Sequence, residues 1–63
     1  MYCLANDSCD RYVYGQSKKV KDYIEWNPNT NWNLQFFPKE NLLLEAVEKL
    51  IKEEGKTVIN LKD

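Results

Sequence analysis

The strongest pattern in the sequence is an apolar stripe with helical spacing in the second half of the chain. Apolar residues recur at i, i+3, i+4, i+7 and i+8, with charged residues on the opposite side: Leu43, Ala46, Val47, Leu50 and Ile51. This spacing predicts an amphipathic helix from about Lys39 to Glu54. Pro38 fits its first turn, and Gly55 is the expected left-handed residue that ends it.

A shorter helical pattern precedes it. Val20, Tyr23 and Ile24 follow the i, i+3, i+4 rule, and Ser17 stands where its hydroxyl could cap the first turn. Proline disfavours helical geometry at the residue that precedes it, so Asn27, which precedes Pro28, should end this helix. We therefore predict a helix from Ser17 to Trp26 or Asn27.

Four further segments have the character of strands. Met1–Ala5 and Arg11–Tyr14 are rich in apolar and aromatic residues, and a polar run with turn-forming Asn and Asp separates them. This arrangement predicts a β-hairpin, with Gly15 ending its second strand. Trp32–Phe36 and Thr57–Leu61 alternate apolar and polar residues, as half-buried strands do.

The predicted order of elements is β-β-α-β-α-β over a single domain, residues 1–63. We expect an α+β fold, a small mixed sheet with two helices on one face. If the third and fourth strands share this sheet, they should be parallel and joined by a right-handed crossover.

The length of 63 residues limits the stability that the fold can reach by itself, because so short a chain can form only a small hydrophobic core. Such a core rarely supplies more than roughly 3–5 kcal/mol, so small domains usually need disulfides, a metal or a partner. Cys3 and Cys9 are the only cysteines, and no secretion signal is apparent, so we expect reduced thiols in a cytoplasmic protein. The chain has no histidine, and two thiolates are too few for structural zinc, so we expect no metal and no cofactor. A partner remains, either a target protein or another copy of the chain.

The charge balance narrows the range of partners. Nine Lys and Arg residues against ten Asp and Glu give a formal net charge of −1. We therefore do not expect nucleic-acid binding, and no apolar stretch is long enough to span a membrane. Lysine and asparagine are abundant and arginine is scarce, as in an AT-rich genome, which suggests a small bacterial or phage open reading frame.

The sequence contains no arrangement that favours catalysis. Without histidine, a Ser or Cys nucleophile would need Asp, Glu or Lys as its base, and none is suitably spaced. Cys3 and Cys9 are separated by five residues, unlike the pairs of zinc ribbons and thioredoxins, and a hairpin would place Cys9 in its turn, away from Cys3. We expect a protein that is not an enzyme, with Cys3 buried as a small apolar residue.

The long helix has a wider apolar surface than one sheet can cover. Leu42 and Leu44 flank the central stripe, so the apolar arc spans about 200°. The excess should contact either Val20 and Ile24 of the short helix or another chain, and the sequence leaves both alternatives open.

Two functional hypotheses follow. The first is a protein-binding module, a small phage or mobile-element protein that forms a homodimer and inhibits or modulates a host protein. Its interface should contain exposed aromatic and leucine side chains: Trp26, Trp32, Phe37, Leu42 and Leu44. The alternative is a small oligomer that binds an anionic small molecule such as a nucleotide at a helix N-terminus. Its residues would be Ser17, Lys18 and Lys19, with Tyr14 or Trp26 as an aromatic lid.

Overall fold

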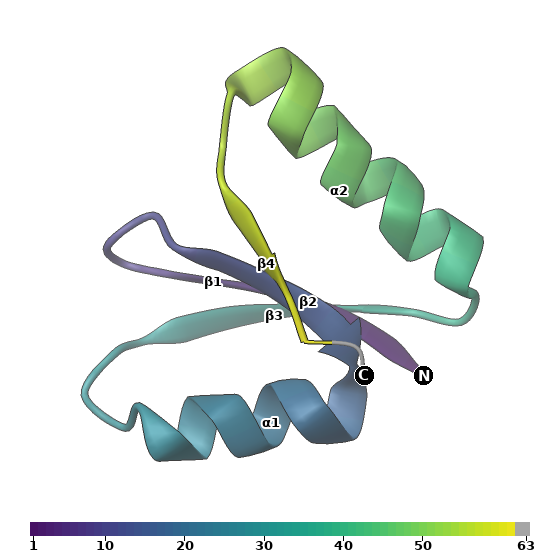
Figure 1. The fold of residues 1–63 in the computed structure, drawn as a ribbon. Helices are drawn as coiled ribbons and strands as arrows, with labels where there is room; N and C mark the ends of the chain where they lie inside the picture. Colours follow the sequence, from purple (N-terminus) through teal and green to yellow (C-terminus); the bar gives the residue numbers. More distant parts are fainter. Residues whose placement is uncertain (62–63) are drawn as a thin grey trace.

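The computed structural model of the chain describes residues 1–61 and has the predicted order of elements (Figure 1). The helices and strands are β1 (Tyr2–Asp7), β2 (Tyr12–Gln16), α1 (Ser17–Trp26), β3 (Trp32–Phe37), α2 (Glu40–Glu54) and β4 (Val58–Asn60). The predicted α+β class and mixed sheet are confirmed.

The four strands form one sheet in the order β3-β1-β2-β4. β1 pairs antiparallel with both β2 and β3, while β4 pairs parallel with β2. β3 and β4 therefore run in the same direction, as predicted, but they lie at opposite edges of the sheet.

The prediction that both helices cover one face of the sheet is wrong, because α1 and α2 lie on opposite faces (Figure 1). The connections from β2 to β3 and from β3 to β4 each join strands that run in the same direction. The first moves across the sheet toward the edge strand β3, and the second moves back toward the edge strand β4. Since such connections are right-handed, each must carry its helix over a different face.

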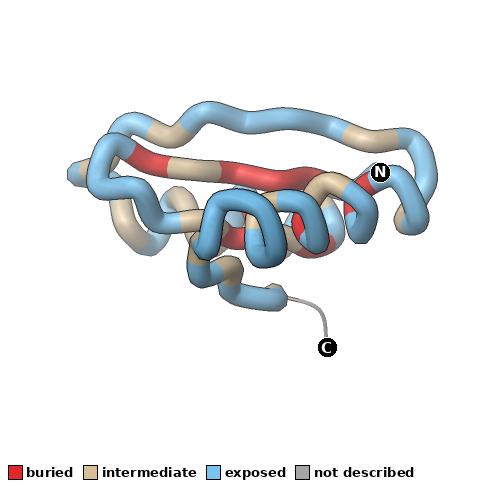
Figure 2. Tube along the Cα trace, turned by 90° about the horizontal axis from the view of Figure 1, so that it is seen from above, coloured by how far each residue is buried: buried red, intermediate tan, exposed pale blue. Residues whose placement is uncertain are grey.

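Two small cores result, one on each face. Alternate residues of β1 supply both: Cys3 and Ala5 pack under α1, and Leu4 packs under α2. Val13 and Val20 complete the first core, and Leu43 and Val47 complete the second. Figure 2 shows these buried residues along the centre of the sheet, beside the exposed edge strand β3.

The ends of the helices differ from the sequence prediction in detail. Gln16, not Ser17, is the extended residue that precedes α1, and it makes no side-chain capping bond. The backbone N–H of Ser17 instead donates to the carbonyl of Met1 at 3.0 Å, because the helix starts directly beside the first strand. Gly15 does not end its strand but lies within β2. Pro38 precedes α2, whose N-cap is Lys39.

The C-terminus of α2 is as predicted. Gly55 adopts the left-handed conformation, with φ 65° and ψ 25°. The N–H of Lys56 then donates to the carbonyl of Leu50 at 3.1 Å, so the chain turns back against the end of the helix. No helix within residues 1–61 is long and apolar enough to cross a membrane.

Candidate functional site

The edge strand β3 carries two exposed large apolar side chains, Leu34 and Phe36. Leu34 and Phe36 pair with Ala5 and Cys3 in the register of β1 and β3, so their side chains project from the face that carries α1. α1 lies mainly over β1 and β2, which leaves Leu34 and Phe36 of β3 partly exposed on this face. Leu34 is 40% exposed and Phe36 43% exposed. We call Leu34, Phe36 and the outer backbone of β3 the β3 edge.

The β3 edge lacks the usual protection of a sheet edge. Natural edge strands are kept short or carry charges, prolines or bulges, because their free backbone groups otherwise pair with other chains. β3 has six residues, none of them charged and none of them proline. β4, at the opposite edge, has only three residues. Of the two edges, β3 is therefore the one suited to pairing with another strand.

One cationic group lies against this surface. The ammonium group of Lys21 on α1 is 5.7 Å from the centroid of the Phe36 ring, within the range of a cation–π interaction. Lys21 thus borders the exposed apolar pair at Phe36.

Trp32 anchors the start of β3. Its ring meets Tyr23 of α1 edge to face, with centroids 5.9 Å apart, and the guanidinium of Arg11 lies 5.6 Å from its centroid. Its indole N–H is buried without a hydrogen-bond partner. Trp32 is therefore a half-buried residue that attaches β3 to the core beneath α1.

Arg11 is held in place by the buried carboxylate of Asp7. Asp7 Oδ1 accepts the backbone N–H groups of Cys9 (3.0 Å) and Arg11 (2.9 Å), and Oδ2 accepts Arg11 Nε at 2.6 Å. Burial alone raises the pKa of Asp7. The hydrogen bonds and the charge of Arg11, together with the N–H of Cys9, lower it by more, so the pKa of Asp7 is below its ordinary value. The hairpin turn is thereby connected through Arg11 to Trp32.

The other predicted interface residues are divided among distant places. Trp26, at the end of α1, is 81% exposed and lines a hollow of about 240 Å³ with Arg11 and the loop 27–30. Leu42 and Leu44 are exposed on α2, on the other side of the sheet. Since α1 lies on the opposite face, they do not contact Val20 and Ile24, so the intramolecular alternative for the wide apolar arc does not hold. Phe37 packs against the core beneath α2.

Sequence reasoning missed Leu34 and Phe36. Their alternation with Asn33 and Gln35 predicted a half-buried strand, and the chain does form that strand. Their exposure depends on where α1 crosses the sheet, and the spacing of apolar residues in α1 carries no information about that. The lack of charge in β3 was the signal available in the sequence.

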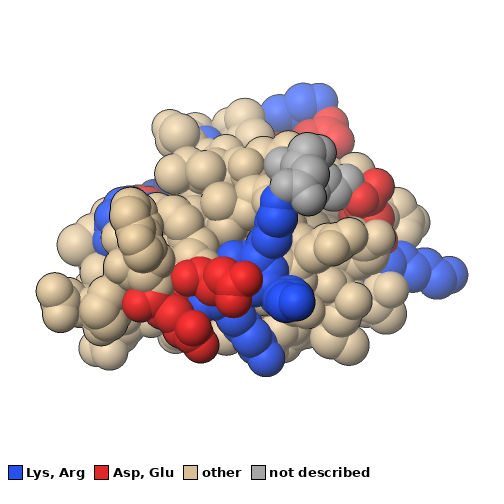
Figure 3. Space-filling view, turned by 60° about the horizontal axis from the view of Figure 1, so that its bottom comes forward, with Lys and Arg blue, Asp and Glu red and all other residues tan. Residues whose placement is uncertain are grey.

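The residues of the predicted anion site are not brought together. Ser17 begins α1 on one face of the sheet, whereas Tyr14 packs against the core on the other. Trp26 lies nine residues along α1, roughly 13 Å from Ser17. Figure 3 shows Lys and Arg side chains beside Asp and Glu side chains on the face that carries α1. α1 itself carries Asp22 and Glu25 as well as its lysines, so its surface is of mixed charge.

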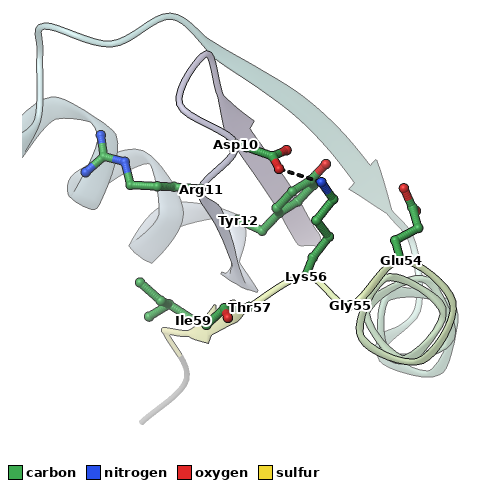
Figure 4. A pocket seen from close by; sticks show the side chains of 8 residues that line it. All are labelled: Asp10, Arg11, Tyr12, Glu54, Gly55, Lys56, Thr57 and Ile59. Carbon is green, nitrogen blue, oxygen red and sulfur yellow. Dashed lines mark hydrogen bonds and ion pairs between the residues drawn. The ribbon is translucent and has the colours of Figure 1, made fainter.

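A hollow of about 360 Å³ lies between the hairpin turn and the junction of α2 with β4 (Figure 4). Its lining residues are Asp10, Arg11, Tyr12, Glu54, Gly55, Lys56, Thr57 and Ile59. Lys56 Nζ binds Asp10 Oδ2 at 2.5 Å, and this hydrogen bond raises the pKa of Lys56. Arg11 points away from this ion pair. The hollow thus holds charges that already neutralise each other and no converging set of polar groups.

The two cysteine thiols are separate, with Cys3 buried and Cys9 exposed in the turn. Burial raises the pKa of Cys3, which makes its thiol a poor nucleophile. No group of three metal-ligating side chains occurs among residues 1–61.

Comparisons with protein-family models, with curated proteins and with solved structures found no match for this chain.

Proposed function

We propose that the chain is a non-enzymatic protein-binding module whose binding surface is the β3 edge. The observation that carries this proposal is a six-residue edge strand without charge or proline, bordered by two exposed apolar side chains, Leu34 and Phe36. An edge of this kind binds an extended segment by strand addition, in which main-chain hydrogen bonds supply affinity and alternate side chains supply specificity.

The side chains of the β3 edge define the segment that it would select. On the α1 face, Leu34 and Phe36 favour apolar or aromatic partners directly opposite. On the α2 face, Asn33 and Gln35 favour amides and hydroxyl groups. The ligand is therefore an uncharged strand in which apolar and polar residues alternate. The role we assign to this binding is inhibition or modulation of a host protein by a small phage or mobile-element protein.

Selection from a random peptide display library tests the proposal. We predict that the wild-type chain enriches peptides with this alternating pattern and that Phe36→Lys abolishes their binding, because a charge on the edge opposes strand addition. The matched control is Ile59→Lys, since Ile59 is 46% exposed at the opposite edge and, from its register with Val13, on the same face. Failure of the chain to enrich any peptide at a concentration at which it is monomeric, or equal loss of binding in the two variants, would contradict the proposal.

A further inference from the structure

We infer that the β3 edge binds β3 of a second copy, in an antiparallel pair with Gln35 on the two-fold axis. This inference rests on the proposed function and names the partner as the chain itself. Two copies of the four-stranded sheet would then form one continuous eight-stranded sheet. β3 would change from an edge strand to a central strand.

The sequence of β3 is complementary to itself in this arrangement. With Gln35 opposite Gln35 of the second copy, Leu34 of each chain lies directly opposite Phe36 of the other. The two most exposed apolar side chains of the strand thus cover each other on the α1 face, in two symmetric pairs. On the α2 face the two Gln35 amides meet, and each can donate a hydrogen bond to the other.

The charges that border β3 are complementary in the same register. α1 runs opposite to β3, and Lys21 lies at the level of Phe36. Glu25 is four residues further along α1, a rise of about 6 Å, so it is displaced from Lys21 toward the start of β3 by nearly the distance from Phe36 to Leu34, since two residues of a strand span about 6.6 Å. Because Phe36 faces Leu34 of the second copy, Lys21 faces Glu25 of the second copy across the apolar pairs.

The neighbouring registers are less favourable. A shift that centres the pair on Leu34 would set each Glu25 against the Glu25 of the other copy, which places like charges together. A shift by a single residue would place Leu34 and Phe36 opposite the polar face of the second strand. The pairing centred on Gln35 places Leu34 opposite Phe36 and, in the same register, Lys21 opposite Glu25.

The small size of the two cores supports a second copy as the partner. Within residues 1–61, the buried apolar side chains are Cys3, Leu4, Ala5, Val13, Val20, Leu43 and Val47. All of these except the two leucines are no larger than valine, and the cores contain neither a disulfide nor a group of metal ligands among the described residues. Pairing through β3 would bury Leu34 and Phe36 and add the stabilisation that such a domain otherwise lacks.

Sedimentation velocity of the full chain over a range of concentrations tests the inference. The wild-type chain and Ile59→Lys should both sediment as dimers, whereas Phe36→Lys should raise the dissociation constant by roughly a hundredfold, because it places a lysine opposite Leu34 beside Lys21. Circular dichroism must show that the Phe36→Lys chain is folded. A wild-type chain that remains monomeric, or a folded Phe36→Lys chain that remains dimeric, would overturn the inference.

A cysteine cross-link tests the register and does not depend on the folding of the lysine variant. In a Cys9→Ser background, Gln35→Cys should form a disulfide-linked dimer on oxidation, since opposite residues of antiparallel strands have Cα atoms about 4.5 to 5.5 Å apart. Asn33→Cys, on the same face, is the control, because its two copies would be about 13 Å apart. If the Gln35→Cys chain formed a dimer that oxidation did not cross-link, the two copies would be joined through another contact, and the inference would again be overturned.

These outcomes separate the inference from the proposed function. A monomeric wild-type chain that still selects alternating peptides through Phe36 would refute the dimer and leave the strand-binding module intact. A chain that neither dimerises nor selects peptides would refute both.

Discussion

Asp7 is the buried charged residue on which the hairpin turn depends. Its side chain is inaccessible to solvent, and it accepts two backbone N–H groups of the turn and the Nε–H group of Arg11. Asn and Asp commonly bond to backbone groups a few residues further along, so a turn near this position could be predicted from the sequence. That the same carboxylate also fixes Arg11 over Trp32 could not, because this contact requires β3 to pair beside β1.

Replacement of this carboxylate should destabilise the protein in a pH-dependent manner. Asp7→Asn removes the ion pair with Arg11, and we expect the melting temperature at neutral pH to fall by several degrees. The folded pKa of Asp7 is lowered from its ordinary value of 3.8, so its contribution is complete well above that pH and is lost as the pH falls through the folded pKa. The difference in melting temperature between wild type and variant should therefore be constant above about pH 5 and shrink below about pH 4.

A matched control separates this effect from that of a surface charge. Glu48→Gln breaks the ion pair with Lys52 on α2, in which both side chains are largely exposed. Exposed pairs contribute little, so its melting temperature should stay close to that of the wild type. If the two variants melted alike, or if the Asp7→Asn difference persisted undiminished at pH 2, the role assigned to Asp7 would be wrong.

Among the elements, α2 and its end were the most predictable from sequence. The apolar stripe and Gly55 located the helix to within one residue, because helical periodicity and the left-handed cap depend on neighbours in the chain. β3 and β4 were found for the same reason, through their alternation, and β1 and β2 through their apolar and aromatic residues on either side of a polar run. Local periodicity does not reveal the contacts between elements. Those contacts determine that Phe37 is packed against the core while Leu34 and Phe36 are exposed.

Gly55 gives a direct test of the helix end. A Cβ at this position would meet no atom within 4 Å, so any cost of Gly55→Ala comes from the left-handed backbone alone. We expect the free energy of unfolding to fall by about 1 to 2 kcal/mol, measured from urea unfolding midpoints. Gly55→Asn should cost less, since asparagine tolerates this conformation better than alanine does. An alanine variant as stable as the wild type would contradict this account of the cap.

For the molecule as a whole, the placement of α1 and α2 shows where sequence patterns stop being informative. Each helix has one apolar stripe, and this stripe requires a sheet face but does not say which one. The face follows from the strand order β3-β1-β2-β4 and the right-handed connections together. The strand order depends on pairing between residues far apart in the chain, such as Tyr2 with Phe37, which local spacing does not reveal.

The central position of the β1–β2 hairpin has a consequence for the order of folding events. The hairpin pairs residues close in sequence, whereas β3 and β4 must each close a longer loop to reach it, at a greater cost in chain entropy. We expect the hairpin to form in the folding transition state and to serve as the template to which β3 adds on one side and β4 on the other.

Stopped-flow kinetics of two valine variants can measure this order. Val13→Ala, in the hairpin, should chiefly slow folding, while Val58→Ala, in β4, should chiefly accelerate unfolding. The reverse assignment would mean that the sheet nucleates at β4. If the hairpin does form first, its two sides are completed as separate events. Every molecule then passes through a state in which the hairpin's unpaired sides are open to strands of its neighbours, so refolding yield should fall as protein concentration rises.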